Sequence, residues 1–285
     1  MTDKTVLITG ATDGIGKATA LLFARQKYNI HLVARNRDKG NELLEKINSL
    51  YPEGEHKLFL TDLSDIKSTE EFLEGYSKTQ QKLDKLILCA GVFVSGNSVN
   101  NKGLDLTFVV NYLSRYMFVA KLSHLLEKSG DAKVIYLGGS RFVNISYDDI
   151  SNPKYNKMFA IWQASTASAF MASFLDNPER NVRHIYWCPG IVNTALVKSQ
   201  SYLMQKLSAL FGMIEPEVAA DNLWNIIANE NHNFFIKRKG KDLPKKIVNN
   251  KFQFERLMEF SAQITKVKMP GRVSLVEKVK AKSII

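Results

Sequence analysis

Three glycines near the start of the chain have the spacing of a phosphate-binding turn. Gly10, Gly14 and Gly16 follow the apolar run Val6 to Ile8 and lead into a helical pattern of apolar residues, the order of a nucleotide-binding unit. Gly10 permits a tight turn, Gly14 lets the backbone approach a pyrophosphate, and Gly16 lets the helix pack closely on the strand. The N–H groups and dipole at the start of that helix would hold the phosphates. The residues between the glycines that we expect in the same site are Thr12, Asp13 and Ile15.

Glycine-rich turns also join elements that bind no ligand, so this alternative stays open. A second feature bears on the ligand. The predicted strand Asn29 to Ala34 is followed at once by Arg35. In dinucleotide-binding folds an acidic residue here, about 20 residues beyond the glycines, accepts the ribose 2′-OH of NAD, whereas an arginine suits the 2′-phosphate of NADP. Because a guanidinium matches a phosphate in charge and shape, the sequence favours NADP(H) over NAD(H); the alternative is a solvated arginine in a polar loop.

The spacing Gly-x-x-x-Gly-x-Gly, preceded by Thr9, resembles that of the short-chain dehydrogenase/reductase family. The resemblance implies that Asp62 lies against the adenine amino group with Leu63 beside it. Without it, Asp62 or Ser64 would be interpreted as a helix N-cap. The resemblance also implies that Ala90 and Gly91 leave room for the cofactor ribose.

Two further stretches match the cofactor side of the family. Asn111 corresponds to an asparagine whose carbonyl holds a water in the proton relay; a structural kink in a helix is the alternative. The family also has a Pro-Gly-x-x-x-Thr sequence that binds the nicotinamide carboxamide and reaches the cofactor, and a rigid turn with a helix cap would look the same. The residues that match it are Pro189, Gly190, Ile191 and Thr194.

One position beneath the cofactor departs from the family. Relatives usually have Asn-Ala-Gly where this chain has Cys89-Ala90-Gly91, and in them the asparagine ties neighbouring strands together. Since a thiol is a poor replacement for an amide, we expect this tie to be weaker or absent.

The family does its chemistry with a serine and a Tyr-x-x-x-Lys pair. The serine polarises the carbonyl, the tyrosine transfers the proton, and the lysine lowers the tyrosine pKa and holds the nicotinamide ribose. In this chain the strand Lys133 to Leu137 ends in Gly138-Gly139-Ser140, which puts Gly139 at the serine position and Ser140 one residue late.

The tyrosine and lysine positions can be counted from the preceding loop. Residues Ile145 to Asn156 resemble the loop before the catalytic helix in the retinol-dehydrogenase branch, which continues Ala-Tyr-x-x-Ser-Lys. Counted without a gap, Ile161 takes the tyrosine place and Ser165 the lysine place; a shift of one residue gives Trp162 and Thr166. Neither register contains the pair, so we expect ordinary family catalysis to be lost or very slow.

Other groups could substitute for the missing pair. Asn111 and Ser140 are the candidate catalytic residues that remain. The loop side chains that could reach the pocket are Tyr147, Asp148 and Tyr155. Tyr202 and Lys206 have the right spacing but lie beyond the next strand, on an expected lid helix at about 201–212, so we interpret them as a coincidence.

Strands and helices alternate along the chain. This order predicts the α/β class, a single-domain Rossmann-type doubly wound parallel sheet of about seven strands with helices on both faces. We expect one domain over residues 1–265 and a basic tail over 266–285. The expected strands are Val6–Ile8, Asn29–Ala34, Lys57–Thr61, Lys85–Cys89, Lys133–Leu137, Val182–Trp187 and, at the sheet edge, Asn233–Lys237. The expected helices after the first are Lys39–Leu50, Thr69–Gln80, Leu104–Lys128, Lys154–Leu175 and about Phe252–Ile264.

Most of the net positive charge of the chain lies near its end. The net charge is +11, and residues 237–285 hold 14 Lys/Arg against 4 Asp/Glu. Such a tail could contact an anionic membrane surface, and a solvated basic rim is the alternative. No motif argues for nucleic acid, the five histidines have no metal-site spacing, and no apolar run is expected to reach membrane-spanning length. Cys89 and Cys188 are expected to be buried thiols.

The start of the chain leaves no room for a signal peptide, so we expect a cytoplasmic protein, or one peripheral to a membrane. A homodimer through the two longest helices is compatible with their apolar content. Three hypotheses remain. The chain is an NADP(H)-binding protein that has lost its hydride chemistry, an active oxidoreductase on a lipophilic alcohol or carbonyl that uses another proton donor, or a peripheral membrane or assembly protein.

Overall fold

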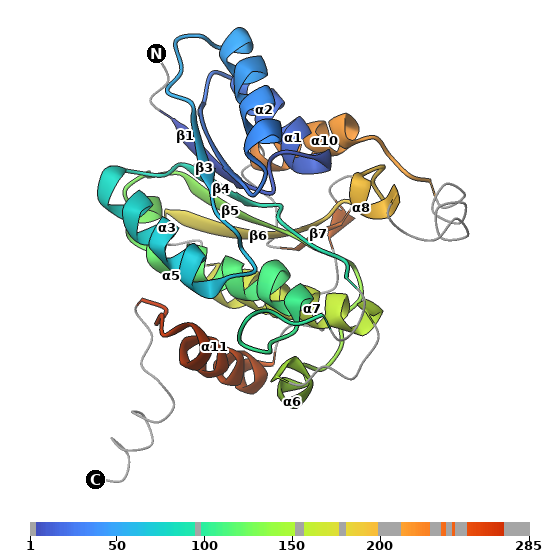
Figure 1. Cartoon of the computed structure of the whole chain (residues 1–285). Helices are drawn as coiled ribbons and strands as arrows, with labels where there is room; N and C mark the ends of the chain where they lie inside the picture. The colour runs from blue at the N-terminus through green and yellow to red at the C-terminus, as the bar shows by residue number, and fades with distance from the viewer. Residues whose placement is uncertain are drawn as a thin grey trace.

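The computed structural model describes residues 4–94, 98–151, 157–176, 181–198, 212–228, 235–237, 241–242 and 250–270. Its centre is a sheet with the strand order β3-β2-β1-β4-β5-β6-β7-β8 (Figure 1). Every pair from β3 to β7 is parallel, and β8 pairs antiparallel with β7. The strands are β1 (Thr5–Thr9), β2 (Asn29–Ala34), β3 (Lys57–Leu60), β4 (Lys85–Leu88), β5 (Ala132–Leu137), β6 (Val182–Cys188), β7 (Phe235–Lys237) and β8 (Lys241–Asp242).

The doubly wound α/β fold predicted from the sequence is confirmed. The central strands are continuous apolar runs because a parallel sheet is covered on both faces; Val6, Leu7 and Ile8 of β1 are fully buried. One detail was wrong. The strand ending at Lys237 is not the sheet edge, because the short β8 pairs outside it.

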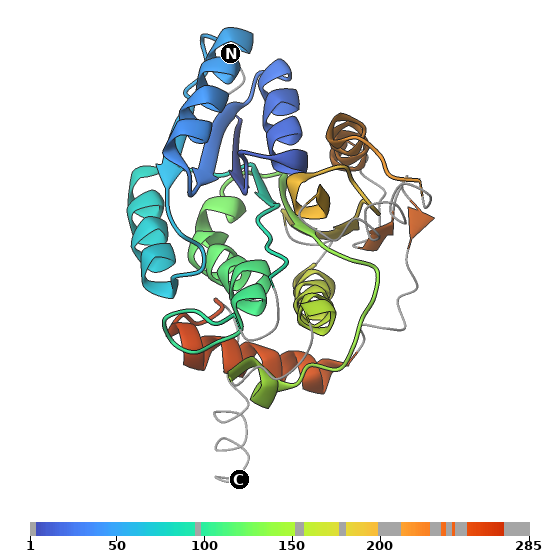
Figure 2. The same ribbon diagram turned by 45° about the vertical axis from the view of Figure 1, so that its right-hand side comes forward.

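Helices α1, α2 and α10 cover one face of the sheet, and α3, α5 and α7 cover the other (Figures 1 and 2). Helix α11 packs outside α5 and α7, on the side away from the sheet. The helices are α1 (Gly14–Arg25), α2 (Arg37–Leu50), α3 (Ile66–Thr79), α4 (Leu106–Phe108), α5 (Ser114–Glu127), α6 (Tyr147–Ser151), α7 (Lys157–Leu175), α8 (Ala195–Lys198), α10 (Pro216–Ala228) and α11 (Lys251–Thr265).

The long helix predicted over Leu104 to Lys128 is interrupted by a π-helical turn, η1 (Val109–Leu113), between α4 and α5. Such turns shift the backbone hydrogen bonds by one residue and are frequent at functional sites. Asn111 lies at its centre.

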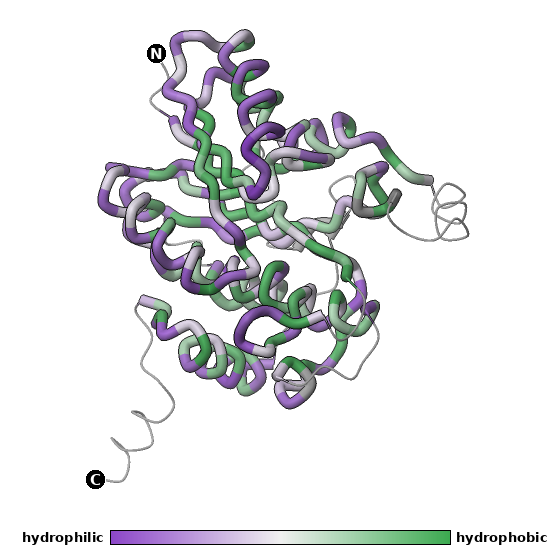
Figure 3. The backbone as a smooth tube through the Cα atoms, viewed as in Figure 1, coloured by the Kyte–Doolittle hydropathy of each residue, from purple (hydrophilic) through white to green (hydrophobic). Residues whose placement is uncertain are grey.

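Two separate apolar layers hold the helices to the sheet. One contains side chains of β1, α1 and α10, such as Ile8, Phe23 and Leu223, and the other joins β4 and β5 to α5, α7 and α11. Figure 3 shows the strands as the most continuously hydrophobic part of the chain, between helices of mixed character.

Helix α11 covers the outer face of η1, α5 and α7. The Tyr112 hydroxyl is 2.8 Å from Ser261 Oγ, the Tyr116 hydroxyl donates to the Val267 carbonyl, and the Phe174 and Phe254 rings stack with centroids 4.5 Å apart. The homodimer expected through these helices would have to use surface that α11 leaves free.

Helix α7 corrects one expectation about membranes. Among the described residues it is long and apolar enough by composition to span a membrane, whereas the sequence predicts no apolar run of that length. However, 61% of that apolar window is buried inside the fold, as in the core helix of a globular domain.

The lid helix predicted at 201–212 lies outside the described residues except for Gly212. Other predicted residues outside them are Tyr155, Tyr202, Lys206 and the tail residues 271–285.

Candidate functional site

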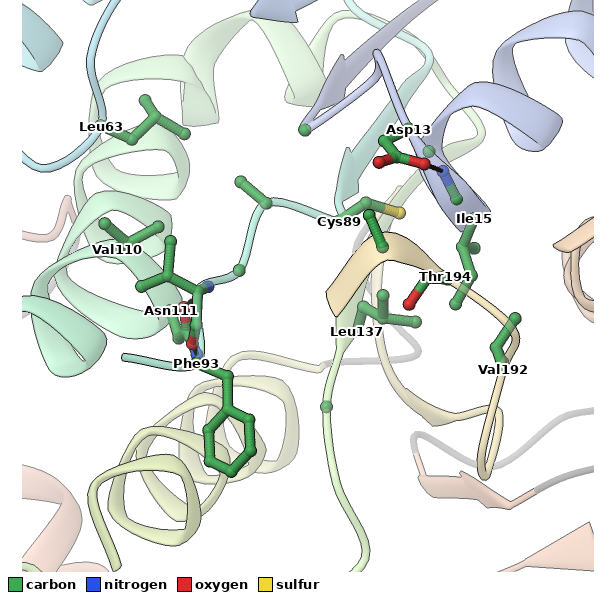
Figure 4. A pocket seen from close by; sticks show the side chains of 18 of the residues that line it. Asp13, Ile15, Leu63, Cys89, Phe93, Val110, Asn111, Leu137, Val192 and Thr194 are labelled. Atoms are coloured by element: carbon green, nitrogen blue, oxygen red, sulfur yellow. Dashed lines mark hydrogen bonds between the residues drawn. The ribbon is translucent and has the colours of Figure 1, made fainter. Parts of the chain in front are cut away.

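A cavity of about 890 Å³ lies at the carboxyl ends of the parallel strands. It spans the place where β1 is flanked by β2 on one side and β4 on the other, the switch point at which doubly wound folds bind ligands. Figure 4 shows Asp13, Ile15 and Thr194 on one side of it and Asn111 and Phe93 on the other, with Cys89 between them. Every residue expected from the sequence to bind the cofactor lines this cavity: Gly10, Thr12, Asp13, Gly14, Ile15, Gly16, Arg35, Asp62, Leu63, Ala90, Gly91, Asn111, Pro189, Gly190, Ile191 and Thr194.

The glycine turn has the geometry for which its residues were singled out. Gly10 and Gly14 have φ angles of +64° and +49°, which side-chain-bearing residues rarely adopt. A Cβ at Gly14 would lie 2.6 Å from Thr194 Cγ2, and one at Gly16 would overlap the carbonyl oxygen of Gly10. The Asp13 carboxylate caps α1 by accepting from Gly14 N at 2.6 Å. The following N–H groups of the first turn are left for phosphate oxygens.

Basic residues stand at the end of β2. Arg35 and Lys39 are exposed and line the cavity. Between them, Asn36 caps α2 by accepting from Lys39 N at 2.9 Å. Two cationic side chains therefore meet the start of a helix at this rim of the cavity, and this combination favours an anion.

Asp62 lies two residues beyond the end of β3, the strand that pairs with β2, and does not cap a helix. Its Oδ1 accepts from the backbone N and the hydroxyl of Ser64, at 2.9 and 2.7 Å. The cap of α3 is Asp65, which accepts from Lys67 N. The alternative interpretation of Asp62 or Ser64 as the N-cap was therefore wrong.

Asn111 is held by hydrogen bonds on both its side chain and its backbone. Its Oδ1 accepts from Val92 N at 2.8 Å, and its Nδ2 donates to the Val92 carbonyl at 3.0 Å. The Asn111 carbonyl accepts from Ser168 Oγ at 3.2 Å. In the family this carbonyl is expected to hold a relay water; here a hydroxyl from α7 bonds to it.

The structure distinguishes the two registers for the missing pair. Ile161 and Ser165 line the cavity, whereas Trp162 and Thr166 do not. The Trp162 ring lies 4.0 Å from the Arg141 guanidinium, and the Thr166 hydroxyl accepts from Val143 N at 2.9 Å. The ungapped register therefore faces the cavity, with an alkyl side chain and a small hydroxyl at the positions where the sequence comparison predicts a phenol and an ammonium.

The serine candidates lie close to that position without reproducing it. Gly139 lines the cavity and donates from its backbone N to Ser165 Oγ at 3.2 Å. Ser140 is exposed and is not among the cavity-lining residues.

The loop candidates are directed elsewhere. Tyr147 is buried against α11, with its hydroxyl donating to the Gln253 carbonyl and the Arg256 guanidinium 4.4 Å from its ring. Asp148 is exposed, and neither residue lines the cavity.

Sequence reasoning missed a buried arginine in the cavity wall. Arg115, one turn after Asn111, is 5% exposed. Its Nη1 donates to the Leu137 carbonyl at 2.6 Å and to Ser168 Oγ at 3.2 Å, and its Nη2 donates to the Ala90 carbonyl at 3.0 Å. The signal in the sequence was a lone charge in an apolar helix face.

Arg115 supplies a connection between the ends of β4 and β5 that the sequence did not predict. Its guanidinium joins Ala90, two residues beyond the end of β4, to the last residue of β5, Leu137. Cys89, at the usual asparagine position, is only partly buried and lines the cavity. Burial raises the pKa of the Cys89 thiol to about 12, against a smaller lowering effect of Arg115. Cys188 is a buried thiol, as expected.

The end of the cavity beyond the catalytic positions is apolar. Val92, Phe93, Met158 and Ile161 line it, and the ammonium of Lys157 lies 4.7 Å from the centre of the Phe93 ring. A lipophilic group would be excluded from water there.

The chain is similar in sequence to proteins of a known family. The model of the short chain dehydrogenase family matches residues 4–203. Retinol dehydrogenase 12 of Bos taurus is 30% identical over 213 residues, which cover 73% of this chain and 67% of that protein. The WW domain-containing oxidoreductase of Gallus gallus is 30% identical over 147 residues, so this chain spans 36% of that protein.

Solved structures share the fold. A short-chain dehydrogenase from Sphingobium yanoikuyae in complex with NADPH superposes with a TM-score of 0.63 at 20% identity, covering 78% of this chain and 83% of the other. A metagenomic short-chain oxidoreductase in complex with NADP gives a TM-score of 0.58 at 20% identity, covering 82% and 95%.

Proposed function

Because this chain belongs to the short-chain dehydrogenase family, in its retinol-dehydrogenase-like branch, we propose that it is an NADP(H)-binding protein in which the usual proton-transfer pair is lost. The observation that carries the proposal is a difference within one cavity. Its phosphate-binding end has the complete glycine turn, while Ile161 and Ser165 line the opposite end at the places expected for tyrosine and lysine. The chain would thus keep the residues that bind the cofactor and lack those that transfer the proton.

Several residues would hold the dinucleotide. The first turn of α1 would bind the pyrophosphate, Asp62 would meet the adenine, and the backbone at Gly190 and Ile191 would face the carboxamide. Arg35 and Lys39, with the start of α2, form the rim where a 2′-phosphate would lie. The residue that follows β2 is a cation and not a carboxylate, so the site favours NADP(H) over NAD(H).

The proton is the missing part of the reaction. The bound cofactor would supply a hydride, and a reduced carbonyl must then receive a proton at its oxygen. Ile161 has no proton to give. The Ser165 hydroxyl is small, accepts from Gly139 N, and has no lysine on its helix face to lower its pKa. Catalysis by the family route is therefore expected to be absent or very slow.

A fluorescence titration with NADPH and NADH tests the cofactor assignment. The wild-type chain should bind NADPH at least about tenfold more tightly than NADH, since charge-assisted hydrogen bonds to phosphate contribute roughly 1.5–3 kcal/mol. Arg35→Ala should remove most of this preference. Arg37→Ala is the matched control, because Arg37 is also exposed on the same segment but does not line the cavity. Absence of binding for both dinucleotides would refute the proposal.

A second candidate is an active oxidoreductase on a lipophilic alcohol or carbonyl compound. The apolar end of the cavity favours it, and so does the similarity to proteins named retinol dehydrogenase. Binding and positioning alone can supply a large part of a rate enhancement. Steady oxidation of NADPH in the presence of long-chain aldehydes or retinoids would select this candidate over the first.

A further inference from the structure

Arg115 is a buried cation that connects the ends of β4 and β5 and has no role in the proposed function. Its guanidinium offers five N–H donors, and three of them bond to Leu137, Ser168 and Ala90. The Nε donor is buried and has no hydrogen-bond partner among the residues that the structure describes. Among the described residues, no carboxylate pairs with Arg115.

A buried charge without a counter-charge is costly, because the carbonyl dipoles around it replace only part of its hydration. The nearest polar neighbours do not neutralise it. The Cys89 thiol remains protonated at neutral pH because burial raises its pKa to about 12. Burial lowers the pKa of Arg115 to about 10, so the guanidinium remains charged at neutral pH. Such a group is expected to meet a polar ligand in the cavity that it lines.

The position of Arg115 shows which part of the dinucleotide it would meet. The pyrophosphate belongs at the glycine turn and the carboxamide at Gly190, so the nicotinamide ribose between them lies over Ala90 and Gly91. Arg115 donates directly to the Ala90 carbonyl, beneath that place, and lines the same cavity.

We propose that Arg115 supplies, from α5, the positive charge that relatives supply with the lysine of their Tyr-x-x-x-Lys pair on α7, and that it binds the nicotinamide ribose. The proposal rests on the proposed function, since it needs a bound dinucleotide. It assigns Arg115 to cofactor binding and leaves the missing proton donor unreplaced.

The neighbours of Arg115 support this replacement. Ser168 bridges the guanidinium to the Asn111 carbonyl, with both distances at 3.2 Å. Ser165 is three residues before Ser168, on the same side of α7. Ser165 contacts Gly139, and Arg115 contacts Leu137, so both residues meet the exit of β5. A lysine at 165 would therefore bring a second cation close to the first.

Because positions 115 and 165 are close, Ser165→Lys should have opposite effects on NADPH affinity in the wild type and in Arg115→Met. Arg115→Met should weaken NADPH binding about tenfold to a hundredfold, the loss of a charge-assisted hydrogen bond. Ser165→Lys alone should also weaken NADPH binding and lower the melting temperature, because two cations would share one buried place. In the Arg115→Met background the same Ser165→Lys change should strengthen binding to within a few-fold of the wild type.

A truncated ligand separates a local effect from a general loss of structure. 2′,5′-ADP carries the adenine and the 2′-phosphate but lacks the nicotinamide ribose. Its affinity should be unchanged in Arg115→Met and reduced in Arg35→Ala. Lys121→Met is the matched control on the same helix, because Lys121 pairs with Glu70 and Glu74 away from the cavity; it should alter neither affinity.

The outcomes are distinguishable from failure of the proposed function. A wild-type chain that binds neither dinucleotide overturns both proposals. A folded Arg115→Met that binds NADPH as tightly as the wild type overturns this one alone, and so does a double variant that binds no better than Arg115→Met. If Arg115→Met does not fold, the double variant and Arg115→Lys decide, since each keeps a cation near the same place and should bind NADPH within a few-fold of the wild type. Folded variants that both bind NADPH more than tenfold more weakly would overturn the proposal.

Discussion

The exit of β5 contains two adjacent glycines that should respond very differently to the same substitution. A Cβ at Gly138 would overlap the Tyr186 hydroxyl and lie 2.5 Å from Tyr186 Cζ, whereas a Cβ at Gly139 would lie 3.4 Å from Ser165 Oγ, an ordinary contact. Tyr186 is fully buried and its hydroxyl donates to the Gly139 carbonyl at 2.7 Å. The ring therefore has no free direction in which to move.

Gly138→Ala should destabilise the protein by about 1–3 kcal/mol, the usual cost of overpacking a closed core. For 285 residues the entropy of unfolding near the melting temperature is roughly 0.6 kcal/mol per kelvin, so the melting temperature should fall by about 2–5 °C. Gly139→Ala should shift it by less than about 1 °C. Thermal unfolding followed by circular dichroism, without cofactor, measures both.

Equal melting temperatures for the two variants, or a larger loss in Gly139→Ala, would refute the assignment of space around Tyr186. The comparison also matters for restoring chemistry. A serine at 139 would fit beside Ser165, whereas one at 138 would not fit, so Gly139→Ser is the change to combine with Ile161→Tyr. If Ser165→Lys is added as well, Arg115 should be neutralised at the same time.

Two further predictions follow from buried titratable groups. His31 is 2% exposed, with Nδ1 2.8 Å from the Tyr76 hydroxyl, and burial lowers its pKa from 6.5 to about 3. As the pH falls below 6.5, the unfolded chain therefore takes up a proton at His31 that the folded chain does not, so the free energy of unfolding falls by about 2 kcal/mol between pH 8 and pH 5. In His31→Gln the free energy of unfolding, measured with urea, should lose this part of its pH dependence. An unchanged pH dependence in the variant contradicts the prediction. The pKa of Cys89 is raised to about 12, so its alkylation by iodoacetamide should be very slow at pH 8 and its rate should still be increasing with pH at pH 10. Bound NADPH should slow the alkylation further. Rapid modification at pH 8 that NADPH does not affect would contradict this prediction, and the guanidine-unfolded chain supplies the uninhibited rate.

Parts of the site could be predicted from the sequence because they depend on local patterns. The glycine turn, the cation after β2 and the alternation of strands and helices are each set by residues that are neighbours in sequence. The absence of a Tyr-x-x-x-Lys pair at the expected place on α7 could also be read directly. The sequence left open which register faces the cavity, because a shift of one residue turns a helical side chain by about 100°.

The chain by itself determined the fold class, the glycine turn and the two pairs of residues, Ile161 with Ser165 or Trp162 with Thr166, that are candidates for the positions of the usual proton donors. Tertiary structure alone decided that Ile161 and Ser165, and not Trp162 and Thr166, line the cavity, that Asp65 caps α3, and that α11 covers α7. It also brought Arg115 between Ala90, Leu137 and Ser168, which come from three different elements. Periodicity fixes which face of a helix is buried, but the partner that a buried charge meets depends on how separate elements pack, and no local pattern contains that information.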